Sequence, residues 1–251
     1  MRSFDQRKAW EEAAAHYQRE FAVDAPLIHY GPLAPTEAEL GLLGNVAGLR
    51  ILEIGCGGGQ SCIALAQQGA SVTGLDLSDA QIHAARQHAK EAGVTVQFVR
   101  GSASNLAAFA EAEWDMIFST LTFHYLAEPL RCLHECHRLL HPHGRLIFSV
   151  DHPLRNCFFD AEENETSLYP VRSYFDHAPM RWRFPGADTI MESYHYTIGE
   201  WVDMIRTSGM HIERLVEPPP PAGVADATWP NDGPLMPMRK IPHTLIVVAH
   251  R

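Results

Sequence analysis

Between residues 49 and 150 the chain alternates short apolar runs with longer stretches whose apolar residues recur at helical spacing. The apolar runs have the length and composition of buried strands. Strands that alternate with helices form βαβ units, and such units build a parallel sheet. The expected strands are residues 49–54, 71–77, 96–100, 114–119 and 145–150, and the expected helices are residues 60–68, 79–91 and 129–140. The sequence therefore predicts an α/β fold with helices on both faces of a mostly parallel sheet.

The flanking segments carry weaker patterns. Trp10, Ala13 and Tyr17 lie at helical spacing and predict a helix over residues 6–21, followed by a proline-rich loop over residues 24–35. Further elements are expected as follows: a short helix that starts at the capping box of residues 36–39, a helix over 197–208, strands over 211–217 and 243–250, and an irregular loop over 218–242.

These elements predict a single domain over residues 1–251. Its expected parts are an N-terminal helical lid (1–45), a core (49–150), an inserted cap rich in proline, arginine and aromatic residues (151–200), and a C-terminal part of the core sheet (201–251). The strand that follows the prolines of residues 218–221 argues against a domain boundary there.

Composition excludes several classes of function. The net charge of −10 and the lack of any basic run argue against a nucleic acid or an anionic membrane as the main partner. No apolar run reaches the length of about 18 residues that a membrane span needs. Residues 1–21 do not resemble a signal peptide, and the five cysteines form no C-x-x-C pair. We expect a cytoplasmic protein; the sequence leaves its oligomeric state open, a homo-oligomer included.

A glycine-rich turn follows the first expected strand, with the spacing Gly55-x-Gly57-x-Gly59. Such a turn between a strand and a helix lets the backbone approach a nucleotide-like ligand closely. Glu53, two residues before the first glycine, would repel a pyrophosphate and attract a cationic group such as an α-ammonium. Asp76 ends the second expected strand, where an acid accepts hydrogen bonds from ribose hydroxyls. The pattern indicates a ribose joined to a cationic amino acid.

These motifs resemble those of the class I S-adenosylmethionine-dependent methyltransferases. The resemblance rests on LEIGCGGG at residues 52–59 and continues, in the same order and spacing, through residues 74–78, 101–103, 114–117 and 139–146. It implies a Rossmann-like sheet of seven strands, with an antiparallel last strand, and S-adenosyl-L-methionine as the cofactor.

The resemblance also implies which residues contact the cofactor. Ser102 stands where the family often has an aspartate that contacts adenine, so the amide of Ala103 is an alternative contact. Tyr17 and Tyr30 resemble positions that close over the cofactor in relatives with an N-terminal lid, although Tyr17 fits a purely structural role equally well. The other expected contacts are Glu53, Gly55, Cys56, Gly57, Asp76, Leu77, Thr120 and Leu121.

Candidates on the side of the methyl acceptor follow the fourth and fifth expected strands. His124 and His152 are candidate general bases, and each fits a structural role as well. Asp151 is a candidate for orienting an amine or for binding a substrate ammonium. The arginines of the cap, including Arg155, are candidates for pairing with a substrate carboxylate. The aromatic cap favours a planar or apolar small-molecule acceptor of the methyl group, at an O, N or C atom that the sequence does not select.

Three other functions fit parts of the pattern. An NAD-dependent oxidoreductase shares the strand, the turn and Asp76, but Glu53 and Gln60 count against it. A non-catalytic module on the same fold and a polyamine synthase remain alternatives. No spacing of histidines predicts a metal site.

Overall fold

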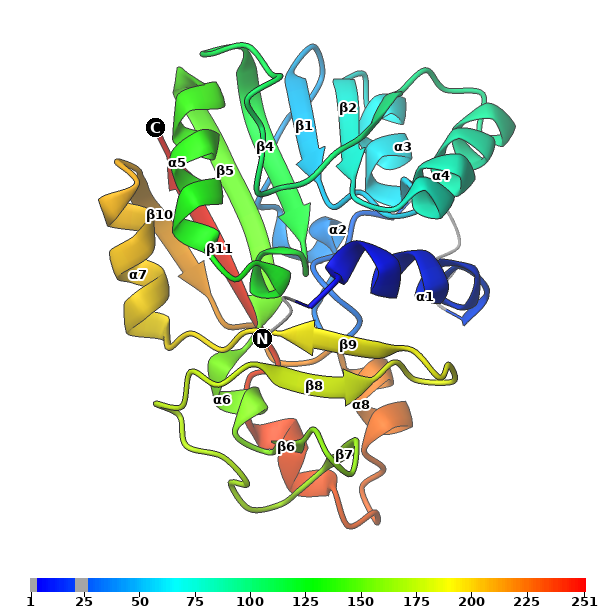
Figure 1. Ribbon diagram of the computed structural model, residues 1–251, viewed down its shortest axis with the longest axis vertical. Helices are drawn as coiled ribbons and strands as arrows, with labels where there is room; N and C mark the ends of the chain where they lie inside the picture. The colour runs from blue at the N-terminus through cyan, green and yellow to red at the C-terminus, as the bar shows by residue number, and fades with distance from the viewer. Residues whose placement is uncertain (1–3, 21–26) are drawn as a thin grey trace.

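A seven-stranded sheet forms the centre of the molecule (Figure 1). The computed structural model describes residues 4–20 and 27–251, so Phe21 and residues 24–26 of the expected lid lie outside the described residues. The strands are β1 (Arg50–Ile54), β2 (Ser71–Asp76), β3 (Gln97–Arg100), β4 (Trp114–Thr120), β5 (Leu140–Asp151), β10 (His211–Val216) and β11 (Thr244–His250). Their order is β10-β11-β5-β4-β1-β2-β3, and β11 runs antiparallel to both of its neighbours. The predicted fold class is confirmed.

Alternate residues of the central strands face two separate cores. Ile51 and Phe118 belong to the core on one face, whereas Leu52 and Ile117 belong to the core on the other. Helices α3 (Gln60–Gln67) and α4 (Asp79–Glu91) cover the first face, and α5 (Pro129–Leu139) and α7 (Ile198–Thr207) cover the second. Because both faces are covered, the middle of β1 and of β4 is a continuous apolar run, Ile51–Leu52 and Met116–Phe118.

Local sequence signals fix the ends of several helices. The Ser78 hydroxyl accepts a hydrogen bond from the Gln81 amide at the start of α4. Thr36 and Glu39 form the predicted capping box of α2 (Glu37–Leu40). Pro129 occupies the first turn of α5, where a missing N–H costs nothing. Each of these signals lies within a few residues of the helix start. The starts predicted from the sequence therefore agree with the observed ones to within one residue.

The fifth strand begins earlier than expected. His141, Pro142 and Gly144 predicted a break before Arg145, yet β5 runs continuously from Leu140. A shift in the register between β4 and β5 accommodates the extra residues, since Trp114 pairs with Leu140 and Met116 with Arg145. The expected stop signal therefore produces an irregularity within the strand.

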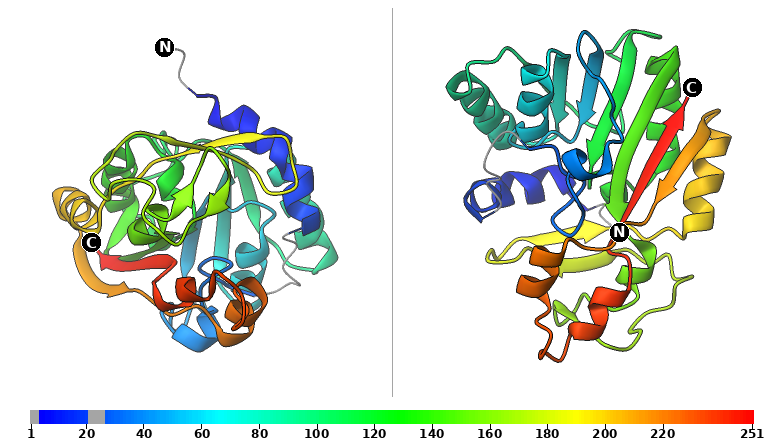
Figure 2. Two further views of the ribbon diagram at one scale, coloured as in Figure 1. Left: turned by 90° about the horizontal axis from the view of Figure 1, so that it is seen from below. Right: turned by 180° about the vertical axis from the view of Figure 1, so that it is seen from behind.

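The cap contains more regular structure than the sequence indicated. It holds the short helix α6 (Pro153–Asn156), the hairpin of β6 (Phe159–Asp160) and β7 (Glu165–Thr166), and the hairpin of β8 (Met180–Arg183) and β9 (Ile190–Ser193). The expected irregular loop over 218–242 instead forms α8 (Ala222–Thr228) and the 3₁₀ turn η2 (Met236–Lys240). Figure 2 shows α8 and η2 beside the cap, beyond the end of the sheet.

The N-terminal helix α1 (Gln6–Glu20) joins the core to the cap. It packs against α4 on one side and against β9 on the other. Trp10 contacts the rings of Tyr125 and Phe184, so an aromatic cluster lies between α1 and the cap. The expected lid helix is therefore docked across both parts.

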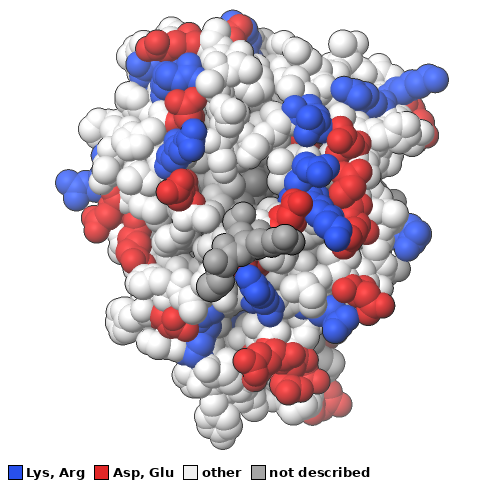
Figure 3. Space-filling model, in the orientation of Figure 1, with Lys and Arg blue, Asp and Glu red and all other residues white. Residues whose placement is uncertain are grey.

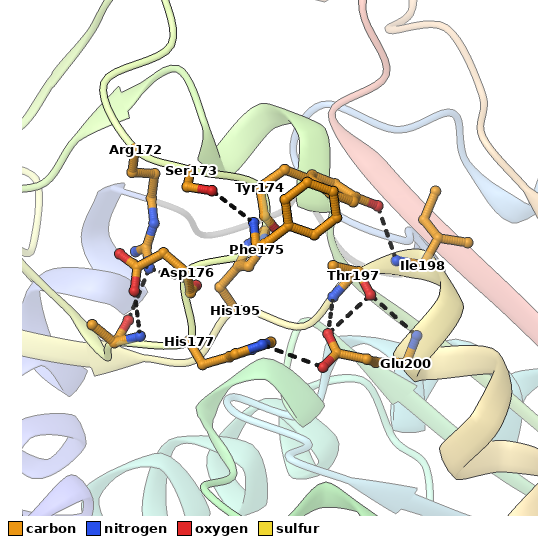
Figure 4. Close-up of polar contacts among 11 residues, drawn as sticks. Arg172, Ser173, Tyr174, Phe175, Asp176, His177, His195, Thr197, Ile198 and Glu200 are labelled. Carbon is orange, nitrogen blue, oxygen red and sulfur yellow. Dashed lines mark hydrogen bonds and ion pairs between the residues drawn. The ribbon is translucent and has the colours of Figure 1, made fainter.

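The loop over residues 172–177 ties the cap to α7 (Figure 4). Arg172 pairs with Asp176 at 3.1 Å, the Tyr174 hydroxyl accepts a hydrogen bond from the Ile198 amide, and His177 lies 3.5 Å from Glu200. These contacts fix the cap at a second point, distant from its start at the end of β5.

The described helices include none that is long and apolar enough to cross a membrane. On the face seen in Figure 3, acidic and basic side chains are interspersed.

Candidate functional site

A cavity of about 780 Å³ lies at the carboxyl ends of β1, β2, β4 and β5. This is where open α/β sheets bind their ligands. Glu53 and Asp76 line one end of it, which we call the donor end. The other end, the acceptor end, is lined by Asp151 and by aromatic side chains of α1 and the cap, among them Trp10 and Trp182.

The glycine loop requires glycine for steric reasons. Gly55 has a φ of 74°, and a Cβ atom there would collide with the side chain of Thr122. Gly59 has a φ of 81° at the N-cap of α3, and a Cβ there would meet Phe98 at 2.9 Å and Ala85 at 3.0 Å. The loop therefore places its backbone close to the cavity, as the spacing predicted.

Asp76 connects the glycine loop to the start of α4. Its carboxylate accepts hydrogen bonds from the Gly57 amide at 2.9 Å and from the Ser78 amide at 2.9 Å. Burial raises the pKa of Asp76, although these two hydrogen bonds oppose the rise. Each carboxylate oxygen has two lone pairs, so the group still has capacity for ribose hydroxyls.

Glu53 is a buried acid, so its ionised form is poorly solvated. Its side chain lines the cavity but the residue is only 3% exposed, and the Cys62 thiol donates a hydrogen bond to it at 2.8 Å. Burial raises the pKa of Glu53 to about 8, and the charge of Asp76 contributes to the rise. Such a group favours a cationic ligand, which stabilises its ionised form.

The other expected donor-end residues also lie at the cavity wall. Leu121 has a φ of 49°, and its side chain packs against Gly31. The Thr120 hydroxyl donates to the His29 carbonyl at 3.1 Å, so it holds the loop after β4 against the N-terminal segment. The structure brings the following predicted residues together around the cavity: Tyr17, Glu53, Gly55, Cys56, Gly57, Asp76, Leu77, Ser102, Ala103, Thr120 and Leu121.

Tyr30 does not lie where the lid hypothesis placed it. It is fully buried, its ring packs on Phe118, and its hydroxyl donates to Glu37 at 2.5 Å. Tyr30 is not part of the cavity wall, because the proline-rich turn directs its ring into the core beneath the sheet. The expectation for Tyr30 was wrong, whereas Tyr17 lines the cavity.

His152 also has a different place from the one expected of a base. Its Nδ1 atom accepts a hydrogen bond from the Leu154 amide and caps α6. A neutral His152 therefore carries its proton on Nε2, which donates to Glu217 at 2.7 Å. Both ring nitrogens are engaged and the side chain is not part of the cavity wall. Of the two roles expected for His152, this placement favours the structural one, at the start of the cap.

His124 remains the candidate base at the acceptor end. It lies in the 3₁₀ turn η1 (Phe123–Tyr125), lines the cavity and is 4% exposed. Its Nδ1 atom has no hydrogen-bond partner among the described residues. Burial lowers the pKa of His124, and the charge of Asp151 partly opposes that shift. The imidazole is therefore neutral near pH 7, as a base requires.

The sequence hypothesis missed two polar residues of α1. Glu11 accepts hydrogen bonds from the Ser78 hydroxyl at 2.7 Å and from the Ala80 amide at 3.1 Å. Gln18 donates to Gln81 at 2.6 Å. The spacing of seven between Glu11 and Gln18 puts them on one face of a helix, and this signal was available in the sequence.

It also missed parts of the acceptor wall. Pro221 and Val224, from the segment between β10 and β11, line the cavity. They lie in segments without helical or strand periodicity, so no sequence signal marked them.

Comparison with known proteins agrees with this geometry. Residues 52–148 match the methyltransferase domain family. The ubiquinone biosynthesis O-methyltransferases of Saccharophagus degradans and Pseudomonas aeruginosa are each 36% identical over 106 residues, which is 42% of this chain and 45% and 46% of those proteins. The chain thus spans less than half the length of these curated relatives in the match.

Solved structures match over a larger part of the chain. An S-adenosylmethionine-dependent methyltransferase from Mesorhizobium loti aligns with a TM-score of 0.70 and 26% identity, over 85% of this chain and 96% of that one. The 1,6-didemethyltoxoflavin-N1-methyltransferase of Burkholderia thailandensis, solved with S-adenosylhomocysteine, has a TM-score of 0.61 and 19% identity, over 98% of this chain and 86% of that one. The second likeness shows the fold alone.

Proposed function

We propose that this chain, a member of the class I S-adenosylmethionine-dependent methyltransferases, transfers a methyl group from that donor to a small-molecule acceptor. The observation that carries the proposal is the single cavity that joins two chemically different ends. The donor end presents the acids Glu53 and Asp76 at the ends of β1 and β2. The acceptor end is closed by the aromatic side chains of α1 and the cap.

The donor end fits S-adenosylmethionine in shape and charge. Glu53 would hold the α-ammonium group, and Asp76 would accept hydrogen bonds from the ribose. Leu77, Ala103 and Leu121 form an apolar slot for the adenine. The donor supplies an electrophilic methyl group on its sulfonium; as the acceptor atom bonds to that carbon, the electron pair of the broken S–C bond stays on sulfur and S-adenosylhomocysteine leaves.

The chain's own residues position the acceptor and take up its proton. The aromatic walls exclude water and limit the orientations of a planar ligand, which brings most of the rate enhancement in a displacement of this kind. When the acceptor atom carries a proton, neutral His124 accepts it. Asp151 lies 3.9 Å from His124 Nε2 and stabilises the imidazolium that forms.

The division into lid, core and cap is part of this proposal. Helix α1 covers both ends, with Tyr17 at the donor end and Trp10 at the acceptor end, and α6, α8 and the two hairpins complete the acceptor wall. We place the enzyme in the cytoplasm because its five buried cysteines are unpaired.

The charges at the donor end favour this donor over NAD. Among the described residues that line the cavity, Arg155 is the only arginine or lysine, and it lies at the acceptor end. A pyrophosphate at the donor end would face Glu53 and Asp76 without a compensating cation. No finding favours the oxidoreductase or the polyamine synthase.

Isothermal titration calorimetry with S-adenosylmethionine and NAD tests the proposal. We expect micromolar binding of S-adenosylmethionine and binding of NAD at least a hundredfold weaker. Asp76→Ala should weaken binding of S-adenosylmethionine by about 1–3 kcal/mol through lost hydrogen bonds to the ribose. Tighter binding of NAD, or unchanged affinity in the folded Asp76→Ala variant, would refute the assignment.

A further inference from the structure

An ion pair lies inside the acceptor end of the cavity. Asp151 ends β5, and Arg155 follows one helical turn later in α6. Nη1 of Arg155 lies 3.0 Å from Oδ2 of Asp151, and both side chains are 29% exposed. Both residues line the cavity, so the exposed parts of the pair are available to a ligand there.

The pair is held from two sides. His152 caps α6 and is anchored to Glu217, which fixes the turn between the two charged residues. The guanidinium of Arg155 lies over the ring of Phe159, 5.9 Å from its centroid. A pair held in this way loses little conformational entropy when a ligand binds to it.

The charges of the pair disfavour a ligand that carries a net charge. Burial acts to raise the pKa of Asp151, but the charge of Arg155 and its hydrogen bond to the carboxylate outweigh burial and hold the pKa below its usual range. Asp151 is thus an anion and Arg155 a cation, while burial keeps His124 neutral. The charges of the pair cancel, so this end of the cavity offers one strong hydrogen-bond acceptor beside one strong donor.

The position of His124 shows which part of the ligand reacts. Its Nε2 atom and Oδ2 of Asp151 are 3.9 Å apart, too far for a direct hydrogen bond. One hydroxyl oxygen can lie at about 2.8 Å from both atoms, which is an ordinary hydrogen-bond distance. The single proton of a hydroxyl there is donated to the Asp151 carboxylate when the ligand binds, and it turns to Nε2 of His124 when the hydroxyl loses it to the base. The neighbouring group of the ligand then faces Arg155.

We propose that Asp151 and Arg155 form the recognition subsite for the methyl acceptor, and that this subsite takes an uncharged aromatic compound whose reacting hydroxyl lies next to a carbonyl group. Asp151 orients the hydroxyl, Arg155 donates to the carbonyl oxygen, and the aromatic walls hold the ring. This inference rests on the proposed function, since it names the acceptor class for the same cavity.

The subsite changes what was expected of the two residues separately. Asp151 alone suggested binding of an ammonium, and Arg155 alone suggested pairing with a carboxylate. Because the two charges compensate each other, a carboxylate ligand meets repulsion from Asp151 and an ammonium ligand meets repulsion from Arg155. An uncharged ligand with adjacent donor and acceptor groups satisfies both without leaving a buried charge unpaired.

Three phenols that differ only in the neighbouring group test this proposal: 2-hydroxybenzamide, 2-hydroxybenzoate and 2-(aminomethyl)phenol. Binding is measured by calorimetry in the presence of S-adenosylhomocysteine, and methyl transfer by the release of S-adenosylhomocysteine from S-adenosylmethionine. For the unmodified protein we expect the neutral amide to bind at least tenfold more tightly than either charged phenol.

Two variants give opposite expectations. Asp151→Asn leaves Arg155 as an uncompensated cation. The affinity for 2-hydroxybenzoate, relative to that for 2-hydroxybenzamide, should therefore rise at least tenfold. Arg155→Met leaves Asp151 as an uncompensated anion, so the ratio of the aminomethyl phenol to benzamide should rise by a similar factor. Ratios cancel any general loss of rate or stability, which a merely structural role would produce equally for all three probes.

The Asp176→Asn variant is the matched control. Asp176 also pairs with an arginine four residues away, Arg172, but neither residue lines the cavity. Its probe affinities should match those of the unmodified protein. A charged phenol that binds best, unchanged ratios in both variants, or no binding of the amide would overturn the proposed acceptor class. In each of those cases binding of S-adenosylmethionine stays intact, whereas failure of the proposed function would abolish it.

Discussion

Under the proposed function, Glu53 should couple binding of the donor to the release of a proton. Burial raises the pKa of Glu53 to about 8, so the carboxyl is mostly protonated at pH 7 in the free protein. An α-ammonium group beside it favours the ionised form, so binding releases a proton below pH 8. Affinity for S-adenosylmethionine should therefore rise with pH up to about 8 and then level off.

Calorimetry at pH 7 in phosphate and in Tris measures this release, because the two buffers differ in protonation enthalpy. We expect close to one proton per bound ligand. The Glu53→Gln variant, which keeps the shape of the side chain, should release almost none. Equal release by both proteins would show that Glu53 does not face the ammonium group. Cys62, Asp76 and Tyr17 interact with Glu53, but none of them carries a positive charge that would replace the ligand.

His124, as the proposed base, should set the acid limb of the pH profile. Burial lowers the pKa of His124, so the acid limb of the profile of kcat/KM against pH should fall below pH 6.5, where the imidazole becomes protonated. Asp151 and Arg155 are the charged groups that face His124, and they shift its pKa in opposite directions. His124→Gln should remove that limb and lower kcat about a hundredfold. An unaltered profile and rate would exclude His124 as the base.

The places of some residues at the cavity were predictable from the sequence and those of others were not. Glu53 and Asp76 follow directly from their places at strand ends, since the carboxyl ends of parallel strands share one edge of the sheet. Tyr30 and His152 were misassigned because the direction of a side chain depends on tertiary partners, here Glu37 and Glu217. The Asp151–Arg155 pair needed the helical turn of α6, which the sequence did not indicate.

At the scale of elements, Glu11 and Gln18 attach α1 to α4 beside the donor end. Glu11 accepts hydrogen bonds at the N-terminus of α4, where a carboxylate is also favoured by the helix dipole. Glu11→Ala should weaken binding of S-adenosylmethionine about tenfold and speed hydrogen exchange of the amides of α1.

The neighbouring residue supplies the control for this prediction. Glu12 pairs with Lys8 on the exposed side of α1, so Glu12→Ala should change neither quantity. Equal effects of the two substitutions would mean that helix propensity, rather than docking on α4, is responsible. Calorimetry and hydrogen–deuterium exchange give the two readouts.

Elements of the core were more predictable than those of the cap. Helices α3, α4 and α5 have caps and apolar faces that are written in adjacent residues. The hairpins of the cap have strands of two to four residues, too short to show alternation, and β9 packs against α1. The strand β5 was shortened in the prediction because Pro142 and Gly144 suggested a stop, whereas pairing with β4 extends it.

At the scale of the whole molecule, the two ends of the cavity are formed by different segments of the chain. Residues 49–150 contribute most of the donor end. Their motifs follow one another in a fixed order along the sequence, so the fold of this part was predictable. The acceptor end combines α1, the cap and α8, which lie far apart in the sequence and meet only after folding. Long-range contacts of this kind leave no periodic pattern in any one segment.

Two segments, one between β5 and α7 and one between β10 and β11, leave the sheet and return to it without interrupting a strand (Figure 1). Insertions, deletions and substitutions within these two segments would alter the acceptor wall while the glycine loop and its two acids stay as they are. Under the proposed function, changes in these two segments would let the methyl acceptor change while the methyl donor stays the same.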